Sequence, residues 1–529
     1  MRKDTINQLK NNHFDLVVIG GGITGAGIAL DAATRGLKTA LIEANDYASG
    51  TSSSSTKLIH GGLRYLKQLE FKLVHEVGSE RAIVHRLAPH LVHPEKMLLP
   101  LLKDGTFGKY GTSLGLWVYD VLANVKGDDK RTMLDKKTTL EKEPLLRNYD
   151  LVGGGFYAEY RTDDARLTIE NIKTAVQNGA FCLNYCKAND FEKENGKITG
   201  VQVTDKEANQ NFTIKTTKVI NAAGPWVDEL RTADKSMNKK RLFLSKGVHI
   251  VVPHNRLPVK QSVYFDNNDG RMLFAVPRHL VTYIGTTDTA YKGDKNDILA
   301  DKNDVEYILN AANQMFPSVK LEHTDVISTW AGVRPLIFEE GKSAGEMSRK
   351  DEVFHSDSGL ISIAGGKLTG YRKMAERLVN LLTDAPCETK NTFLLGGYFN
   401  DYQEVITYKT VIKERLIQMG LDAQMSDYLV NNYGRQTDEI LDKVVEIGNG
   451  KINALTLAEA DFCINKEQAL HLLDFFNIRT GRIYFYPFNI ENCLEDVATF
   501  FAKKLNWNET KRFNEIESVK NEIKRLACF

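Results

Sequence analysis

A glycine-rich turn between an apolar run and a helical stretch constrains the fold of this chain most. Residues 14–19 (FDLVVI) are apolar and rich in β-branched side chains, which predicts a buried parallel strand. Residues 23–35 are rich in alanine and predict a helix, which Gly36 ends. Residues 38–42 predict a second strand. The order strand, turn, helix, strand is that of a βαβ unit.

The turn carries the pattern G-x-G-x-x-G at Gly20, Gly22 and Gly25. In such a turn the first glycine permits the tight bend, the second lets backbone N–H groups approach a pyrophosphate, and the third lets the helix pack closely. The helix N-terminus then favours the phosphates. Glu43 ends the next strand and can accept hydrogen bonds from a ribose. We therefore predict a dinucleotide site that includes these residues and Thr24.

Two later segments indicate FAD rather than a nicotinamide cofactor. Residues 221–226 (NAAGPW) follow an apolar strand, so the chain passes the cofactor again at Ala223 and Gly224. Residues 364–371 (AGGKLTGY) also follow a strand and open a helix. A helix start there can face the flavin pyrimidine oxygen and stabilise the anionic reduced ring. We predict non-covalently bound FAD.

The length of 529 residues predicts more than one domain, because single hydrophobic cores stop growing near ~250–300 residues. Strand-like runs between residues 96 and 290 predict an antiparallel sheet that covers the cofactor, and helical spacing dominates from about residue 391. We therefore predict an α/β fold in which a Rossmann-like FAD-binding domain is interleaved with this sheet. The FAD-binding domain with its interleaved substrate cap spans residues 1–390, and the cap lies mostly at 70–160 and 235–345. Residues 391–529 form a separate, all-helical domain.

Charge and cysteine patterns exclude several classes of function. A formal net charge of +1 gives no basic field for nucleic acid. The six cysteines form no CxxC pair, so we expect reduced thiols and no metal site. The first residues lack the apolar core of a signal peptide, and no run reaches the ~18–20 apolar residues of a spanning helix. We expect a cytoplasmic protein, at most peripheral on a membrane.

With these segments, the chain resembles the FAD-dependent, quinone-linked glycerol-3-phosphate dehydrogenase family. The most specific match is TSSSSTKLIHGGLRYL at residues 51–66, where the family carries a near-identical serine-rich loop. Further matches run in family order at 246–253, 284–288, 330–336 and 365–373, with looser likeness at 431–441 and 475–481. The resemblance implies the fold of the D-amino-acid-oxidase and glutathione-reductase superfamily.

The resemblance also implies the reaction. The enzyme oxidises sn-glycerol 3-phosphate to dihydroxyacetone phosphate by hydride transfer to flavin N5, and electrons pass to membrane quinone. By this resemblance the enzyme is expected to dock on the inner face of the cytoplasmic membrane. Whether it forms a homodimer is left open. The segment IYFYPF (483–488), near Arg479 and Arg482, is a candidate docking surface because apolar anchors with a basic rim suit a membrane. A packed core segment explains it equally well.

Candidate substrate and catalytic residues follow from the matched segments. A phosphate dianion favours arginine, which donates paired N–H groups, and the family places such contacts at Arg64, Tyr65, Arg334 and Arg349. Lys367 and Thr369 sit beside the ring in this interpretation, with Lys367 holding the substrate oxygen or stabilising the reduced flavin. His60 and His249 are the two candidate bases, with His60 favoured because its loop should pass under the flavin. We expect the remaining cofactor contacts at Ser52, Ser53, Lys57, Leu58, His60, Gly61, Gly62, Ala188, Gly366, Lys367, Leu368 and Thr369.

Alternative functions stay open from the sequence. Oxidases of the wider family use oxygen and carry a longer middle region, whereas residues 290–330 are compact here, which favours the dehydrogenase. Arg278 also departs from the family, since many relatives have tryptophan there. An oxidase of 2-hydroxyacids or amino acids would clamp a carboxylate, which usually needs one arginine. A flavin-dependent tRNA-modifying protein is disfavoured by the near-zero net charge.

Overall fold

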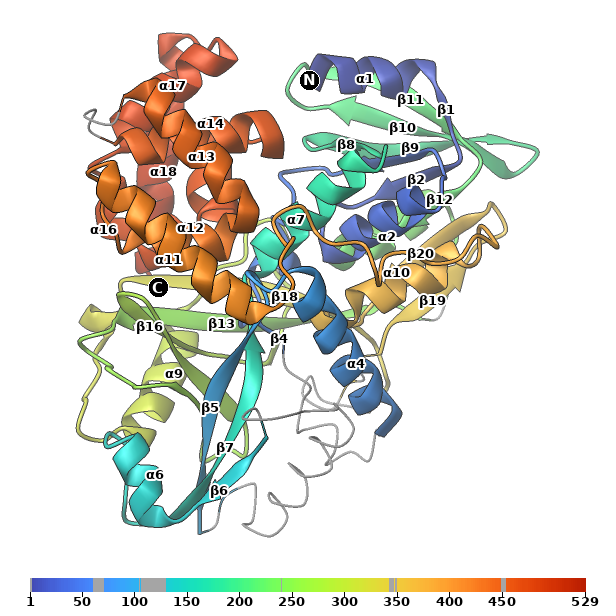
Figure 1. Ribbon diagram of the computed structural model, residues 1–529. Coiled ribbons are helices and arrows are strands. Elements are labelled where there is room, and N and C mark those ends of the chain that lie inside the picture. The colour runs from blue at the N-terminus through green and yellow to red at the C-terminus, as the bar shows by residue number, and fades with distance from the viewer. Residues whose placement is uncertain are drawn as a thin grey trace.

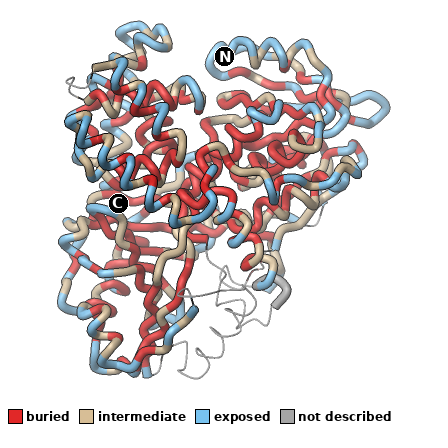
Figure 2. Tube along the Cα trace, in the orientation of Figure 1, coloured by how far each residue is buried: buried red, intermediate tan, exposed pale blue. Residues whose placement is uncertain are grey.

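The computed structural model contains three β-sheets and a C-terminal group of helices (Figure 1). Buried residues follow the strands and the boundary between the helices and the sheets (Figure 2). The structure describes residues 2–59, 71–103, 105, 130–238, 240–341, 347, 350–448 and 453–529.

The first sheet contains the glycine-rich turn and has six strands. Their spatial order is β19 (Glu352–His355), β20 (Leu360–Ala364), β12 (Val219–Asn221), β2 (Leu16–Ile19), β3 (Thr39–Ile42) and β8 (Phe181–Leu183). All pairs are parallel except the edge pair of β19 with β20. The predicted strand, turn and helix are thus confirmed, with the helix as α2 (Ile23–Thr34).

Both faces of this sheet are covered, which explains the continuous apolar run of β2. Leu16 and Val18 join a core with α2, α7 (Asp164–Gln177) and α10 (Tyr371–Val379). Val17 and Ile19 point to the other face, where they join a core with the four-stranded sheet. That sheet has the order β1 (His13–Phe14), β11 (Gln210–Thr216), β10 (Lys197–Asp205), β9 (Cys186–Glu194), and α1 (Arg2–Asn11) and α8 (Val227–Ala233) lie nearby.

The third sheet is the predicted cap and has ten strands. Its main path is β17 (Thr289–Ala290), β13 (Leu242–Pro253), β16 (Val281–Gly285), β15 (Met272–Arg278), β14 (Ser262–Asp266), β5 (His93–Leu102), β7 (Leu151–Arg161) and β4 (Leu58–Ile59). β18 (Ser328–Ile337) pairs with β13, and β6 (Thr132–Leu134) pairs with β7. The pairs are antiparallel as expected, apart from the parallel pair of β14 with β5. Helix α9 (Lys302–Met315) covers one face, and α6 (Lys136–Lys142) packs beside β7.

The C-terminal region is helical, as expected from about residue 391, and packs on the other face of the ten-stranded sheet. Before it lies α4 (Phe71–Leu87). The C-terminal helices are α11 (Tyr402–Gln418), α12 (Met425–Tyr433), α13 (Thr437–Ile447), α14 (Ala454–Glu467), α15 (Arg482–Phe485), α16 (Pro487–Ile490), α17 (Leu494–Leu505) and α18 (Glu509–Ala527).

The candidate docking segment at 483–488 is largely core. Ile483 and Phe485 are each 1% exposed and pack near Trp330 of β18, and Arg479 and Arg482 are buried. Of the two interpretations of this segment, the packed core agrees with the structure and the basic rim does not, because both guanidiniums pair with buried carboxylates of the helical region and of the loop after β3. Among the described residues, no helix has the length and apolarity to cross a membrane.

Candidate functional site

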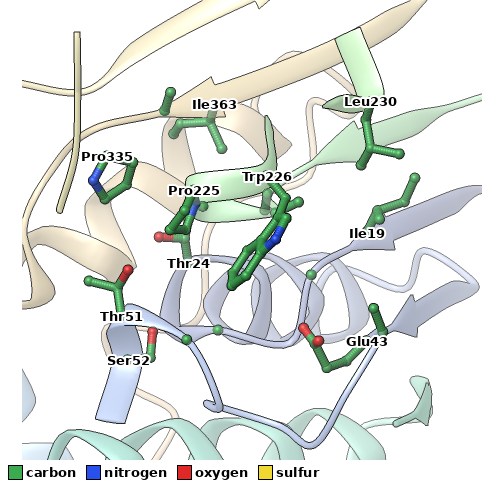
Figure 3. A pocket seen from close by; sticks show the side chains of 18 of the residues that line it. Ile19, Thr24, Glu43, Thr51, Ser52, Pro225, Trp226, Leu230, Pro335 and Ile363 are labelled. Atoms are coloured by element: carbon green, nitrogen blue, oxygen red, sulfur yellow. The ribbon is translucent and has the colours of Figure 1, made fainter. Parts of the chain in front are cut away.

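A cavity of about 500 Å³ opens at the C-terminal ends of the strands in the six-stranded sheet (Figure 3). The glycine-rich turn forms its floor, with Glu43 at the end of β3 on one side. The serine-rich loop, residues 222–226 and residues 363–368 form the other walls. In Figure 3, Trp226 projects into the centre of the cavity, opposite Glu43. Ligands of open α/β sheets bind at this edge.

The backbone of the turn requires its glycines. Gly20 has a φ of +115°, and a Cβ there would lie 2.5 Å from the carbonyl oxygen of Ala222. A Cβ on Gly25 would overlap the carbonyl oxygen of Gly20, so α2 packs tightly on the turn. The close passage of residue 222 over the turn joins the first and second cofactor segments in one wall. This bare backbone cradle fits the pyrophosphate of a dinucleotide.

Glu43 is fixed by the turn itself. Its Oε2 accepts a hydrogen bond from the Gly21 N–H at 2.6 Å, and its Oε1 accepts one from the Asn45 N–H at 2.9 Å. Burial raises the pKa of the carboxyl, and the backbone N–H groups oppose that shift. A carboxylate has about four acceptor positions, so it can still accept hydrogen bonds from ribose hydroxyls.

The serine-rich loop is tied to three elements at once. Ser52 Oγ accepts a hydrogen bond from the Ile23 N–H at 2.9 Å, at the start of α2. Thr51 Oγ1 donates to the Val333 carbonyl oxygen of β18 at 2.7 Å, and the Ser55 N–H donates to Asp164 of α7. The loop therefore links the cofactor turn to the cap sheet, and Thr51 and Ser52 line the cavity.

Three predicted cofactor residues in this loop point away from the cavity. Ser53 Oγ bonds to the Gly50 carbonyl oxygen. Lys57 is buried, and its Nζ lies 2.5 Å from Asp164 Oδ1 and 3.1 Å from the Ser53 carbonyl oxygen. Leu58 belongs to β4 and to the core beneath the cap. The contacts of Ser53 and Lys57 fix the shape of the loop.

His249 lies on β13 and is 1% exposed. Its ring stacks on Trp330 at 4.7 Å between centroids, and its Nε2 lies 3.0 Å from Thr56 Oγ1. Nδ1 is buried without a hydrogen-bond partner in the described ranges. Burial, with smaller contributions from Arg334 and Lys57, holds the pKa of His249 well below its usual range. The imidazole is therefore neutral at pH 7.

Arg334 lies on β18, on the same face of the sheet as His249. The two strands pair Ser245 with Arg334 and His249 with Trp330. The guanidinium donates to Thr286 Oγ1 at 3.1 Å and to Asp288 Oδ1 at 3.4 Å. The next residue, Pro335, lines the cavity, whereas the Arg334 side chain lies on the opposite face of the strand, over Gly247.

The second glycine pair shapes the wall opposite the turn. Gly365 and Gly366 have φ of +81° and +85°, and a Cβ on Gly365 would lie 2.5 Å from the Lys350 carbonyl oxygen. These bends place Lys367 and Leu368 in the cavity lining, whereas Thr369 is buried behind it. The expected helix start follows as a short 3₁₀ turn and then α10.

The structure thus brings together most of the predicted cofactor residues. Those that line the cavity are Gly20, Gly22, Thr24, Glu43, Ser52, Ala188, Ala223, Gly224, Gly366, Lys367 and Leu368. Gly25, Ser53, Lys57, Leu58 and Thr369 lie behind its walls. The predictions for His60, Gly61, Gly62, Arg64, Tyr65 and Arg349 lie outside the described residues.

Several lining residues were not expected from the sequence. Trp226 and Pro225 belong to the quoted segment NAAGPW but were not singled out. Lys206, on the turn between β10 and β11, donates from Nζ to Asn45 Oδ1 at 2.8 Å and so closes the cavity beside Glu43. Only long-range folding places Lys206 there, since nothing in its local sequence marks it.

Known proteins resemble the chain along its whole length. The family model described as FAD dependent oxidoreductase matches residues 15–372, and the one for the C-terminal domain of alpha-glycerophosphate oxidase matches residues 387–512. The aerobic glycerol-3-phosphate dehydrogenase of Bacillus subtilis is 46% identical, with 98% of this chain and 96% of the relative covered. Its counterpart in Staphylococcus aureus strain USA300 is also 46% identical, with 99% and 96% covered.

Solved structures also resemble the chain. The glycerol-3-phosphate dehydrogenase of Bacillus halodurans, complexed with FAD, is 43% identical and superposes with a TM-score of 0.86, covering 99% of this chain and 97% of that one. The L-alpha-glycerophosphate oxidase of Mycoplasma pneumoniae superposes with a TM-score of 0.57 at 20% identity, covering 70% and 95%. The second likeness concerns the fold alone.

Proposed function

Because the chain belongs to the FAD-dependent glycerol-3-phosphate dehydrogenase family, we propose that it oxidises sn-glycerol 3-phosphate to dihydroxyacetone phosphate with FAD as hydride acceptor. The full-length similarity to proteins of that name carries the proposal. The cavity adds physical support, since its glycine cradle and Glu43 suit the pyrophosphate and a ribose.

Bound FAD supplies an electron-pair acceptor at N5. The chain supplies the cradle around it: the start of α2 offers backbone N–H groups, Ser52 fixes that start, and Lys367 lies in the wall made by residues 363–368. An ammonium there stabilises negative charge on the reduced ring or holds the substrate oxygen. Trp226 projects into the same cavity from the segment after β12.

Arg334 is the proposed anchor for the substrate phosphate. Thr286 and Asp288 fix the orientation of its guanidinium, which leaves the planar group preoriented for a dianion. We propose that Arg64, Tyr65 and Arg349 complete the clamp. Fixing the phosphate at a defined distance from the reacting carbon positions the secondary alcohol for reaction.

His60, which lies outside the described residues, stays the favoured acceptor of the hydroxyl proton, and His249 is the alternative that the structure describes. A base must be unprotonated before the reaction, and burial keeps His249 neutral. Trp330 and Thr56 fix the plane of its ring. Arg334 lies on the same sheet face and lowers the same pKa, so the phosphate anchor and this candidate base are electrostatically linked.

Membrane quinone is the proposed electron acceptor, with oxygen as the alternative. We further propose that the enzyme works as a cytoplasmic protein peripheral to the inner face of the membrane, alone or as a homodimer. A stopped-flow comparison of reduced enzyme with a soluble quinone and with oxygen separates the two acceptors. Faster reoxidation by oxygen than by quinone would favour the oxidase.

Anaerobic bleaching of the flavin tests the substrate. Glycerol 3-phosphate should bleach the bound flavin, whereas glycerol and lactate should not, because they lack the phosphate. Arg334→Gln should raise KM for glycerol 3-phosphate by about 10-fold or more, the loss expected when a charge-assisted hydrogen bond is removed. Bleaching by lactate, together with a neutral Arg334→Gln variant, would favour an oxidase of 2-hydroxyacids or amino acids.

A further inference from the structure

A second cleft lies between the cap sheet and the helical region, apart from the FAD cavity. It is formed where β5 and β7 and the turn after β15 meet α12, and its volume is about 40 Å³. Such a volume holds roughly three water molecules, which is enough for a small tetrahedral ion and too little for a nucleotide. No residue of the described FAD cavity lines it.

Three buried polar groups in the lining of this cleft have no partner in the described part of the chain. Both ring nitrogens of His90 lack a hydrogen bond, although the residue is 0% exposed. The same is true of Thr162 Oγ1, in a residue that is 2% exposed, and of Asn431 Oδ1. Buried polar atoms are nearly always paired, so their concentration around one cleft indicates a bound species.

Two guanidiniums supply positive charge to the same cleft. Arg161 donates from Nη2 to Glu95 Oε1 at 2.8 Å, and Arg278 donates from Nη2 to Asp163 Oδ2 at 2.9 Å. Arg161 also pairs with Glu95 through Nε and donates from Nη2 to the Pro277 carbonyl oxygen at 2.5 Å, so Nη1 is the part of this guanidinium that remains for a ligand. Asp163 also lines the cleft, but it is held between Arg278 and Lys57.

Neighbouring imidazoles report a positive potential. Burial and then the charge of Arg161 lower the pKa of His93 to about 3, and burial and then the charges of Arg278 and Arg161 lower that of His279 to about 4. Lys409 acts in the same direction at both rings, and at His279 Asp427 opposes the shift more strongly than Lys409 adds to it. Burial is the largest cause of both shifts, and the guanidiniums of the cleft come next.

We propose that this cleft binds a small tetrahedral oxyanion, either inorganic phosphate or the phosphate group of a monoester, between Arg161 and Arg278. His90 and Thr162 supply the remaining hydrogen-bond donors. The anion would join the cap sheet to α12 of the helical region. Asp163 links Arg278 to Lys57, whose Nζ donates a hydrogen bond to the Ser53 carbonyl oxygen in the serine-rich loop. Binding of an anion in the cleft should therefore affect the position of the loop that lines the FAD cavity.

A crystallographic test uses the holoenzyme with selenate, whose anomalous scattering distinguishes it from water. The expected result is a selenate peak within hydrogen-bonding distance of Arg161 and Arg278. Water alone in the cleft at high selenate concentration would contradict the proposal. The FAD and its contacts report separately on the proposed function, since neither depends on the anion.

A solution test excludes an ion that binds only at crystal concentration. It is made with Arg334→Gln holoenzyme, which weakens phosphate binding at the substrate site. Inorganic phosphate should still raise Tm in a saturable manner at constant ionic strength, because it binds the folded state. Adding Arg278→Gln should weaken that response at least about 10-fold, as expected for the loss of one charged donor.

Two further variants, one in the cleft and one control, make the proposal testable even if Arg278→Gln perturbs folding. Thr162→Val preserves side-chain shape, removes an unpartnered hydroxyl, and should also weaken the phosphate response. Arg256→Gln removes an exposed arginine that pairs with Asp325 on the cap surface and should leave the response unchanged. An unaltered response in both cleft variants would overturn the proposal. Glycerol 2-phosphate in place of phosphate shows whether esters also enter.

Discussion

The guanidinium of Arg334 lies over the backbone of Gly247, so that a Cβ at residue 247 would clash with its terminal nitrogens. The two strands place Gly247 opposite Gly332. This pair is the next one on the same face of the sheet after the pair of Ser245 and Arg334. Gly285 leaves similar room beside the ring of His249. Missing side chains thus create the hollow in which the proposed phosphate anchor and the candidate base His249 lie.

Gly247→Ala is expected to displace the Arg334 guanidinium and raise KM for glycerol 3-phosphate about 10-fold, with FAD content unchanged. Steady-state kinetics and flavin absorbance measure the two effects. Gly293→Ala is the control, since a Cβ there meets the hydroxyl end of the half-buried Tyr291 ring and neither Arg334 nor His249. Unchanged KM in Gly247→Ala would remove Arg334 from substrate binding.

Glu43→Ala is expected to weaken FAD binding by about 10-fold or more, because it removes the acceptor for the Gly21 and Asn45 N–H groups and the proposed ribose contact. Titration of apoenzyme with FAD gives the Kd. Glu194→Ala, at an exposed position at the end of β9, should bind FAD as the unaltered protein does. Equal affinities for the two variants would contradict the assignment.

Glu467→Gln is expected to destabilise the fold by about 3 kcal/mol, because removing one member of a buried ion pair leaves the other charge uncompensated. Glu467 accepts from Arg166 at 2.7 and 2.8 Å and from Lys173 at 3.0 Å, and all three side chains are buried. Urea unfolding of the holoenzyme measures the loss. Glu446→Gln breaks the exposed pair with Lys443 and should cost under ~1 kcal/mol.

The stability contributed by His471 is expected to depend on pH. Burial alone would lower its pKa, but hydrogen bonds to Glu207 and Glu515 outweigh burial and raise it to about 10. Because the pKa of His471 is higher in the folded state than in the unfolded state, its contribution to stability is fully present at pH values below the unfolded-state pKa of ~6.5. This contribution is lost as the pH rises toward 10. His471→Gln should therefore lower Tm at pH 6 and approach the unaltered protein near pH 10.

The control for that series is His323→Gln. His323 is half-exposed, and its Nε2 lies 3.9 Å from Glu306 Oε1, which is too far for a hydrogen bond. It should change Tm little at either pH. A constant Tm deficit of His471→Gln from pH 6 to pH 10 would show that packing, not charge, accounts for the loss. His471 joins the turn after β10 to the helical region through Glu207, so the same series measures the strength of that junction.

Much of the fold follows from local sequence. The strand at 16–19, the turn and the helix after it were predictable because β-branched periodicity, alanine content and glycine positions act on the backbone over a few residues. The second glycine segment at 364–371 was predictable for the same reason. These segments meet at one cavity because parallel strands place their C-terminal ends at a common edge.

Side-chain partners were decided by the tertiary structure alone. Lys57 was expected at the cofactor, yet its ammonium lies against Asp164, more than a hundred positions away. The sequence left open whether Arg479 and Arg482 face a membrane, and in the structure they pair with Asp46 and Glu459 in the interior. A buried charge needs a counter-charge, and the fold supplies it from distant segments. Local patterns therefore set the backbone here, and long-range packing chose which polar side chains reach the cavity.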